Sequence, residues 1–269
     1  MNVLKLKNDV NHNIYFNYNT RIKYFANGII KLKYTNYDIT KGVSNITKGV
    51  SNITNKNKTS SEKEKLHQRY KNLYNSKSKL IDLAYNNSKI TPWEYFVTFT
   101  FDKQKINRGD YNAISHVMRK WRDNVQHQNP NLKALIVPEP HDDGKIHFHG
   151  LIANAPNLKL KEARNIKTNR LIYKNGSKIY NISNFKYGFT ECSQIKNQTA
   201  VSVYISKYMT KNLIDLDFKK RYWATTNLER PRIKYAYLDN DTLKFFIKDN
   251  DLKIDYVNDN GLFATSYNV

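Results

Sequence analysis

Three of the seven histidines in this 269-residue chain, His141, His147 and His149, lie within nine residues of one another. His147 and His149 alternate with Ile146 and Phe148, a pattern typical of a β-strand. We therefore expect both imidazoles on one face of the strand and both apolar side chains on the other, in the core.

The segment before these histidines contributes a carboxylate. The turn 142–144 (Asp-Asp-Gly) folds the preceding strand back, which brings Glu139 beside His147 and His149. Two imidazoles and a carboxylate make a three-ligand site with open positions, where a divalent cation can hold a phosphate oxygen. His141 is an alternative third ligand, and a pair of ordinary surface histidines is the simpler interpretation. A closed structural zinc site is disfavoured because it needs a fourth ligand, commonly a thiolate.

A second group of reactive side chains lies on a predicted helix over 199–213. At about 100° per residue, Tyr208 falls about 40° from Tyr204, Lys211 about 20° and Lys207 about 60°. Two phenols and two ammonium groups thus share one stripe, while a different face is apolar and suited to the core (Ile205, Met209 and Leu213). A cation beside a phenol favours the phenolate and neutralises phosphate. Such a helix alone is usually structural, and its significance comes from its occurrence with the histidine strand.

The elements that must position these groups alternate between strand and helix. Strands are predicted over 95–101, 134–139, 145–153 and near 188–191, and helices over 111–126 and 199–213. The connection between the second and third strands is too short for a crossover helix, so these strands are antiparallel neighbours. We expect an α+β fold of ferredoxin-like type, with a central antiparallel sheet and helices on one side.

The flanking segments differ in composition. Residues 14–37 are predicted to form a β-hairpin with its turn at Asn27-Gly28, and an exact tandem heptapeptide over 40–53 is typical of a flexible linker. A lead-in helix begins at Ser61, with Glu64 as capping-box partner and Leu66, Tyr70, Leu73, Leu80 and Ala84 on one face. The expected organisation is 1–60 hairpin and linker, 61–92 lead-in helix, 93–231 core, with an irregular lysine-rich insert over 157–178, and 232–269 C-terminal extension, a candidate for edge strands.

Global composition narrows the class of protein. Lys and Arg number 45 against 23 Asp and Glu, which gives a net charge of +22. This charge indicates a polyanionic partner, most often nucleic acid, although AT-rich coding also inflates lysine. A single cysteine, Cys192, excludes an internal disulfide and fits a reducing cytosol. No apolar run is long enough to span a membrane, so we expect a cytoplasmic protein with no membrane partner.

Three motifs in this order resemble those of the HUH endonucleases, specifically the rolling-circle replication initiators (Rep proteins) of plasmids and phages of low-GC bacteria. The segment 96–102 is similar to their first, hydrophobic motif, and Glu139 with His147 and His149 to their metal motif. Tyr204 and Lys207 match a Tyr-x-x-Lys nucleophile motif, which Tyr208 and Lys211 repeat. The segment 221–231 also resembles one that follows this helix in such initiators. The likeness covers about half of the chain, 93–231.

The resemblance implies a site-specific DNA nickase and strand transferase. Glu139, His147 and His149 would hold Mg²⁺ or Mn²⁺, and Tyr204 would attack a single-stranded or extruded origin hairpin, leaving a 5′-phosphotyrosine and a 3′-OH primer. Lys207 would steady the phenolate or the phosphate. Tyr208 is either a second nucleophile, as paired tyrosines are in some phage initiators, or a packing residue, and the order of the two could be reversed. Because no P-loop motif occurs, a host helicase would unwind the DNA for a host polymerase.

Three basic residues are further candidates for DNA contact, Lys211 on the tyrosine helix and Arg119 and Lys120 on the helix 111–126, where a solvated face is the simpler interpretation. Rival functions are a mobilisation nickase similar to the relaxases, a metal-dependent hydrolase, and a non-catalytic DNA-binding protein on the same scaffold. The tyrosine follows the histidine motif here, whereas conjugative relaxases typically place it before.

Overall fold

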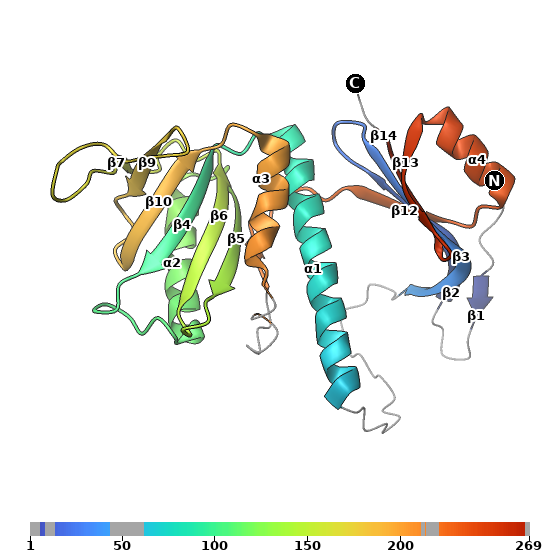
Figure 1. The fold of residues 1–269 in the computed structure, drawn as a ribbon, viewed down its shortest axis with the longest axis horizontal. Helices are drawn as coiled ribbons and strands as arrows, with labels where there is room; N and C mark the ends of the chain where they lie inside the picture. The colour runs from blue at the N-terminus through green and yellow to red at the C-terminus, as the bar shows by residue number, and fades with distance from the viewer. Residues whose placement is uncertain (1–5, 9–13, 44–61, 211–212, 214–220, 267–269) are drawn as a thin grey trace. The chain divides into compact units, whose positions relative to one another are not determined.

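The computed structural model describes residues 6–8, 14–43, 62–210, 213 and 221–266 (Figure 1). The chain divides into two compact units, one formed by residues 60–230 and the other by residues 1–59 together with 231–269. Each unit has an antiparallel sheet with helices packed on it, which confirms the predicted α+β class. The two terminal segments, far apart in the sequence, share one sheet.

The sheet of the 60–230 unit carries the histidine strand near its centre. Its strand order is β11-β5-β6-β4-β10-β9-β7, with β8 paired to β9, and all of the pairs are antiparallel. The strands are β4 (Tyr95–Phe101), β5 (Lys133–Pro140), β6 (Ile146–Ala153), β7 (Leu160–Glu162), β8 (Tyr173–Lys174), β9 (Ser177–Ile182), β10 (Gly188–Gln194) and β11 (Trp223–Ala224). The predicted strands and the tight β5–β6 connection are confirmed.

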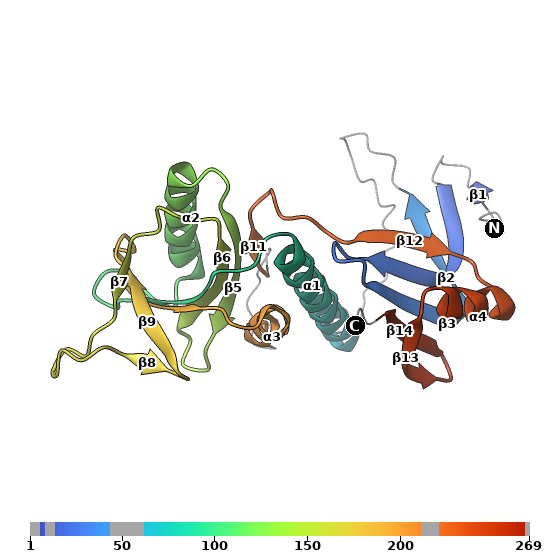
Figure 2. The same ribbon diagram turned by 90° about the horizontal axis from the view of Figure 1, so that it is seen from above.

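Helices cover both faces of this sheet, so the expectation of helices on one side was wrong (Figures 1 and 2). On one face α2 (Tyr111–Gln128) packs against Phe99 and Phe148, and on the other α1 (Glu62–Ile90) packs against Leu135 and Leu151. The reason is that β5 and β6 carry apolar residues at both odd and even positions, and such strands bury both of their faces.

The lead-in helix α1 runs five residues beyond its predicted end near Tyr85, to Ile90. Leu73, Leu80 and Ala84 are buried, as their spacing predicts, whereas Leu66 and Tyr70 are exposed. The predicted cap Ser61 lies outside the described residues. The indole of the buried Trp93 anchors the C-terminal end of α1, because its Nε1 donates to the Ala84 carbonyl at 2.9 Å.

The tyrosine helix is shorter than predicted. It begins at an Asn197 cap, whose side chain accepts from the Ala200 amide, and α3 (Gln198–Tyr204) gives way to a 3₁₀ turn, η1 (Ile205–Tyr208). Hydroxyls that bond back to main-chain carbonyls compete with the helical pattern here, since Ser206 Oγ donates to the Val203 carbonyl at 2.7 Å. The apolar face is nevertheless buried as predicted (Ile205, Met209 and Leu213).

The insert over 157–178 was expected to be irregular and instead contains β7, β8 and the start of β9. Asn175 and Gly176, with φ of 49° and 69°, form the tight turn between β8 and β9. Two successive residues with positive φ make the turn type that matches the twist of a hairpin, so this Asn-Gly pair is the signal that sequence analysis overlooked.

The unit made of the two terminal segments has strand order β1-β2-β3-β14-β13, with β12 paired to β2. The predicted hairpin is confirmed, with Gly28 at φ 82° in its turn, whereas most of the tandem repeat lies outside the described residues. The tail provides strands, as expected, and also a helix that was not predicted. The elements are β1 (Leu6–Asn8), β2 (Ile14–Tyr24), β3 (Ile30–Val43), β12 (Arg232–Ala236), α4 (Asn240–Asp249), β13 (Leu252–Asn258) and β14 (Gly261–Ser266).

Within the described part of the chain, none of the helices combines the length and the apolar character that a membrane crossing requires.

Candidate functional site

The strand register brings the predicted metal ligands to one face of the sheet. Glu139 on β5 pairs directly with His147 on β6, and Thr98 on β4 pairs with His149. Because Phe148, between the two histidines, is fully buried against α2, both imidazoles face the side of the sheet that α1 and α3 cover. The turn at 142–144 thus places the carboxylate beside the histidines, as expected from the sequence.

Glu139 is the centre of this cluster. Its Oε2 lies 2.7 Å from His149 Nε2 and 3.3 Å from His141 Nε2. The rings of His141 and His147 are 4.4 Å apart between centroids. Both candidates for the third ligand, Glu139 and His141, are therefore present together at the same place.

Two threonines of β4 orient the two imidazoles from behind. Thr98 Oγ1 lies 3.1 Å from His149 Nδ1, and Thr100 Oγ1 lies 3.3 Å from His147 Nδ1. A hydrogen bond at Nδ1 fixes the ring orientation and directs Nε2 outward. Sequence analysis missed these two residues, although their alternation with Val97 and Phe99 is the period-2 signal that places them on the histidine face.

Burial sets the protonation of the cluster. It lowers the pKa of His149 despite the hydrogen bond to Glu139, and together with the charges of His141 and His149 it lowers the pKa of His147. Burial acts to raise the pKa of Glu139, but the hydrogen bond and the charge of His149 outweigh it, so that this pKa lies below its usual range. Neutral imidazoles beside an ionised carboxylate are the protonation states that bind a divalent cation.

The donor set fits such a cation chemically, because it combines carboxylate oxygen with imidazole nitrogen. In the described residues no three His, Cys, Asp or Glu side chains are already spaced around a common ion position. The facing atoms of Glu139 and His149 are instead hydrogen-bonded to each other. A bound ion would replace that hydrogen bond.

The two tyrosines lie against this cluster. The Tyr208 ring stacks on the His149 imidazole, with centroids 3.5 Å apart and an interplanar angle of 14°. Its hydroxyl donates to the Tyr204 hydroxyl at 2.9 Å. Phe96 contacts all three rings, at centroid distances of 6.0 Å to His149, 5.5 Å to Tyr204 and 5.9 Å to Tyr208. The chain therefore joins the histidine strand and the tyrosine segment in one site.

The environments of the two phenols differ. Tyr208 is half-buried, and its burial, followed by the hydrogen bond to Tyr204, raises the pKa of its phenol well above the usual value. Tyr204 is 42% exposed, and the Lys207 ammonium lies 5.0 Å from the centroid of its ring. Tyr208 is consequently held as a neutral hydrogen-bond donor, while Tyr204 is the phenol that a substrate can reach.

The remaining predicted residues are not part of this cluster. Arg119 and Lys120 are exposed on α2, which covers the opposite face of the sheet. Lys211 lies outside the described residues. Cys192 is buried, and burial raises the pKa of its thiol to about 12, so that the thiol is unreactive at neutral pH.

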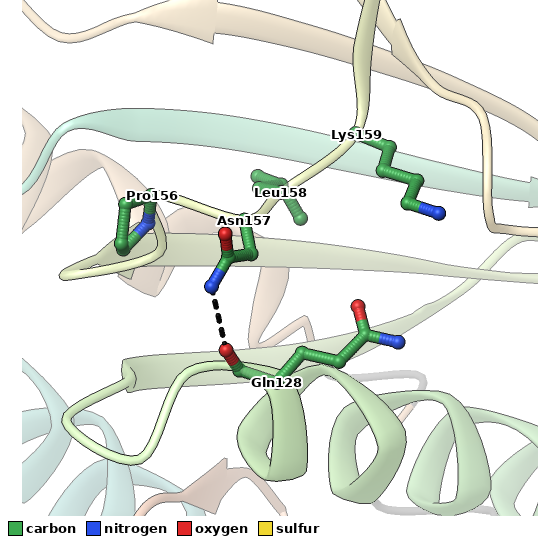
Figure 3. A pocket seen from close by; sticks show the side chains of 5 residues that line it. All are labelled: Gln128, Pro156, Asn157, Leu158 and Lys159. Carbon is green, nitrogen blue, oxygen red and sulfur yellow. Dashed lines mark hydrogen bonds between the residues drawn. The ribbon is translucent and has the colours of Figure 1, made fainter.

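A surface pocket near the C-terminal end of α2 is a separate feature (Figure 3). It is lined by Gln128, Pro156, Asn157, Leu158 and Lys159, and Asn157 Nδ2 donates to the Gln128 carbonyl at 2.8 Å. These residues follow the end of β6, whereas His147 lies at its beginning. The pocket brings together no acid, base or nucleophile that would support catalysis.

Comparison with known proteins supports one assignment. A protein-family model for replication-associated proteins of the ORF2 type matches residues 94–213, a range that contains every residue of the cluster described above. No curated protein matches the chain, and no solved structure does. The site therefore lies in a segment similar to a family of replication-associated proteins.

Proposed function

We propose that this protein is a rolling-circle replication initiator of the HUH endonuclease type, which nicks single-stranded origin DNA by tyrosine transesterification. The observation that carries the proposal is the stacking of Tyr208 on His149 at 3.5 Å, with Tyr204 hydrogen-bonded to it. A nucleophilic phenol and a carboxylate–imidazole cluster thus lie side by side, which is what attack on a held phosphodiester requires. The match to a replication-associated family supports the biological setting.

Tyr204 is the proposed nucleophile. Its oxygen attacks the scissile phosphorus while the bond from phosphorus to the 3′ oxygen breaks. The phenol proton is lost, the 3′ oxygen takes up a proton to become the 3′-OH primer, and the 5′ phosphate stays bound to Tyr204. Its exposure and the nearby Lys207 favour this role, because a cation beside the phenol stabilises negative charge on both phenolate and phosphate.

Tyr208 supports this attack as a hydrogen-bond donor. Its phenol stays protonated at neutral pH and points at the Tyr204 oxygen. A donor aimed at an oxygen that carries developing charge stabilises the reacting state. Action as a second nucleophile would require Tyr208 to lose its proton and to leave the His149 ring, so the donor role fits the described arrangement better.

Glu139, His147 and His149 are the residues proposed to hold Mg²⁺ or Mn²⁺, with His141 as a further ligand at the edge of the cluster. Such an ion would polarise the scissile phosphate and neutralise its charge. Thr98 and Thr100 hold the two imidazoles at their Nδ1 atoms, so that Nε2 is the atom presented to a ligand.

The proposal is tested with a labelled single-stranded oligonucleotide from the origin of the replicon that encodes the protein. Incubation with Mn²⁺ should give a slowly migrating protein–DNA band on a denaturing gel, which EDTA prevents. The Tyr204→Phe variant should lose the band and still bind the oligonucleotide. A 5′-phosphate product without an adduct would identify a hydrolase, and binding with neither product nor adduct would identify a non-catalytic DNA-binding protein.

A host helicase and polymerase are proposed partners, since an initiator that only nicks needs other proteins to unwind and copy the DNA. Cytoplasmic location in a bacterial host, on a plasmid or phage replicon, completes the proposal. Pull-down of a helicase from host extract by the covalent complex, and not by the Tyr204→Phe variant, would test the partnership.

A further inference from the structure

One face of the sheet built from the two terminal segments is apolar and covered. Ile22, Leu32 and Ala264 are mutual cross-strand neighbours, and they pack with Leu243 of α4 in a buried cluster. Figures 1 and 2 show α4 along one side of this sheet. Because neighbouring positions of a strand point to opposite faces, the residues between these apolar positions form the other face, here called the basic face.

The centre of the basic face is a block of four cations. Arg21 pairs directly with Lys33, and Lys23 pairs directly with Lys31, in neighbouring rows of the β2–β3 hairpin. Paired side chains on adjacent strands lie about 5 Å apart at Cβ, and like charges at that distance repel. Burial, and after it the charge of Arg21, lowers the pKa of the Lys33 ammonium, as expected where cations crowd together. A fold that places two such pairs side by side is suited to a polyanion.

Aromatic rings continue one of these rows. Phe263 on β14 pairs with Lys33, and Tyr256 on β13 pairs with Phe263. Their rings are 6.5 Å apart between centroids, and they are 41% and 56% exposed. The Lys33 ammonium lies 5.1 Å from the centroid of the Phe263 ring. At the far end of the row, Tyr235 on β12 pairs with Arg21.

Cations beside exposed rings on a sheet match the chemistry of an unpaired nucleic-acid strand. Its phosphates need positive charge, and its bases need flat apolar surfaces on which to stack. A duplex offers the same phosphates but keeps its bases stacked inside, so it would leave Phe263 and Tyr256 unused. Asp255 is turned to Thr265 at the edge of the sheet, where its carboxylate accepts a hydrogen bond of 2.6 Å, and lies outside the cation block.

We propose that the basic face is a second DNA-binding site, which holds single-stranded DNA that flanks the nick. The phosphates lie on Arg21 and Lys33, and bases stack on Phe263 and Tyr256. This inference rests on the proposed function, because it takes its ligand from the strand on which Tyr204 acts. It gives the terminal segments a role that the nuclease motifs do not explain.

The test measures binding of the full chain to fluorescein-labelled oligothymidylate by anisotropy over a range of salt concentrations. Phe263→Leu, which keeps an apolar side chain but removes the ring, should weaken binding about tenfold. Arg21→Gln with Lys33→Gln should lower the slope of log affinity against log salt by about 1.4, the effect of two lost phosphate contacts. The control Lys244→Gln with Lys248→Gln removes the same charge from α4 and should change binding much less.

Three results overturn the inference. Unchanged binding in both basic-face variants would do so, and so would an equal loss in the α4 control, which indicates charge alone. A loss restricted to duplex DNA would assign the face to duplex instead. Equal unfolding midpoints by circular dichroism establish that the variants are folded, and Phe263→Leu decides if the double variant is not.

Failure of the proposed function gives a different result. With a short oligonucleotide that spans only the nick, the basic-face variants should form the Tyr204 adduct at the wild-type rate. If the wild-type chain forms no adduct at all while the basic-face variants still lose binding to oligothymidylate, the nickase proposal fails and the second binding site stands.

Discussion

Removal of one oxygen atom tests the division of labour between the two tyrosines. Tyr208→Phe deletes the hydroxyl that donates to Tyr204 at 2.9 Å, and it keeps the ring that stacks on His149 at 3.5 Å. The substitution also leaves Phe96 in contact with the same ring, so packing is conserved. Any loss of activity therefore measures the hydrogen bond.

The magnitude follows from the charge that develops on the accepting oxygen. A hydrogen bond to a charged group contributes about 1.5–3 kcal/mol, and each 1.4 kcal/mol is a factor of ten in rate. Tyr208→Phe should thus form the covalent adduct about 10-fold to 100-fold more slowly than the wild-type chain, without abolishing it. Tyr204→Phe should form none.

The assay is single-turnover adduct formation with an origin oligonucleotide and saturating Mn²⁺, followed on denaturing gels. Unchanged affinity of Tyr208→Phe for the oligonucleotide would confine the defect to the chemical step. Wild-type rates in Tyr208→Phe would refute the donor role. An adduct that persists in Tyr204→Phe and disappears in Tyr208→Phe would reverse the assignment of the nucleophile.

Three further expectations concern the support of the site. Thr98→Val removes the hydrogen bond at His149 Nδ1 and should weaken Mn²⁺ binding about 10-fold to 100-fold by calorimetry, and unchanged binding would exclude the positioning role. Burial lowers the pKa of His147 and His149, so the unfolded chain binds protons first as the pH falls below about 6.5. Urea titrations should therefore show a lower free energy of unfolding at pH 5.5 than at pH 7, and the dependence should weaken in His149→Gln. Leu80→Ala on α1 should lower this free energy by about 2–5 kcal/mol, whereas Leu66→Ala on the exposed part of the same helix should change it by less than about 0.5 kcal/mol.

Local patterns predicted the site well because its parts lie in short-range elements. The alternation around Phe148 and the tight turn at 142–144 suffice to place Glu139 beside the histidines. The four-residue spacing of Tyr204 and Tyr208 brings them together even though the helix changes to a 3₁₀ turn at Ile205. That change depends on competing hydrogen bonds, which helical periodicity does not contain.

Long-range pairing could not be predicted in the same way. β14 pairs with β3 across more than two hundred residues, and neither strand carries a signal for the other. The basic face exists only through this pairing, since it joins Phe263 to Lys33. The exposure of Leu66 and Tyr70 likewise depends on how far the core extends along α1, which the spacing of apolar residues does not reveal.

The most direct test of the central claim is mass spectrometry of the adduct after protease and nuclease digestion. The account predicts a peptide that carries a 5′-linked nucleotide phosphate on Tyr204, formed with Mn²⁺ and missing when Glu139→Gln is used. A nucleotide attached to any other residue, or cleaved DNA with a free 5′ phosphate and an unmodified Tyr204 peptide, would contradict it.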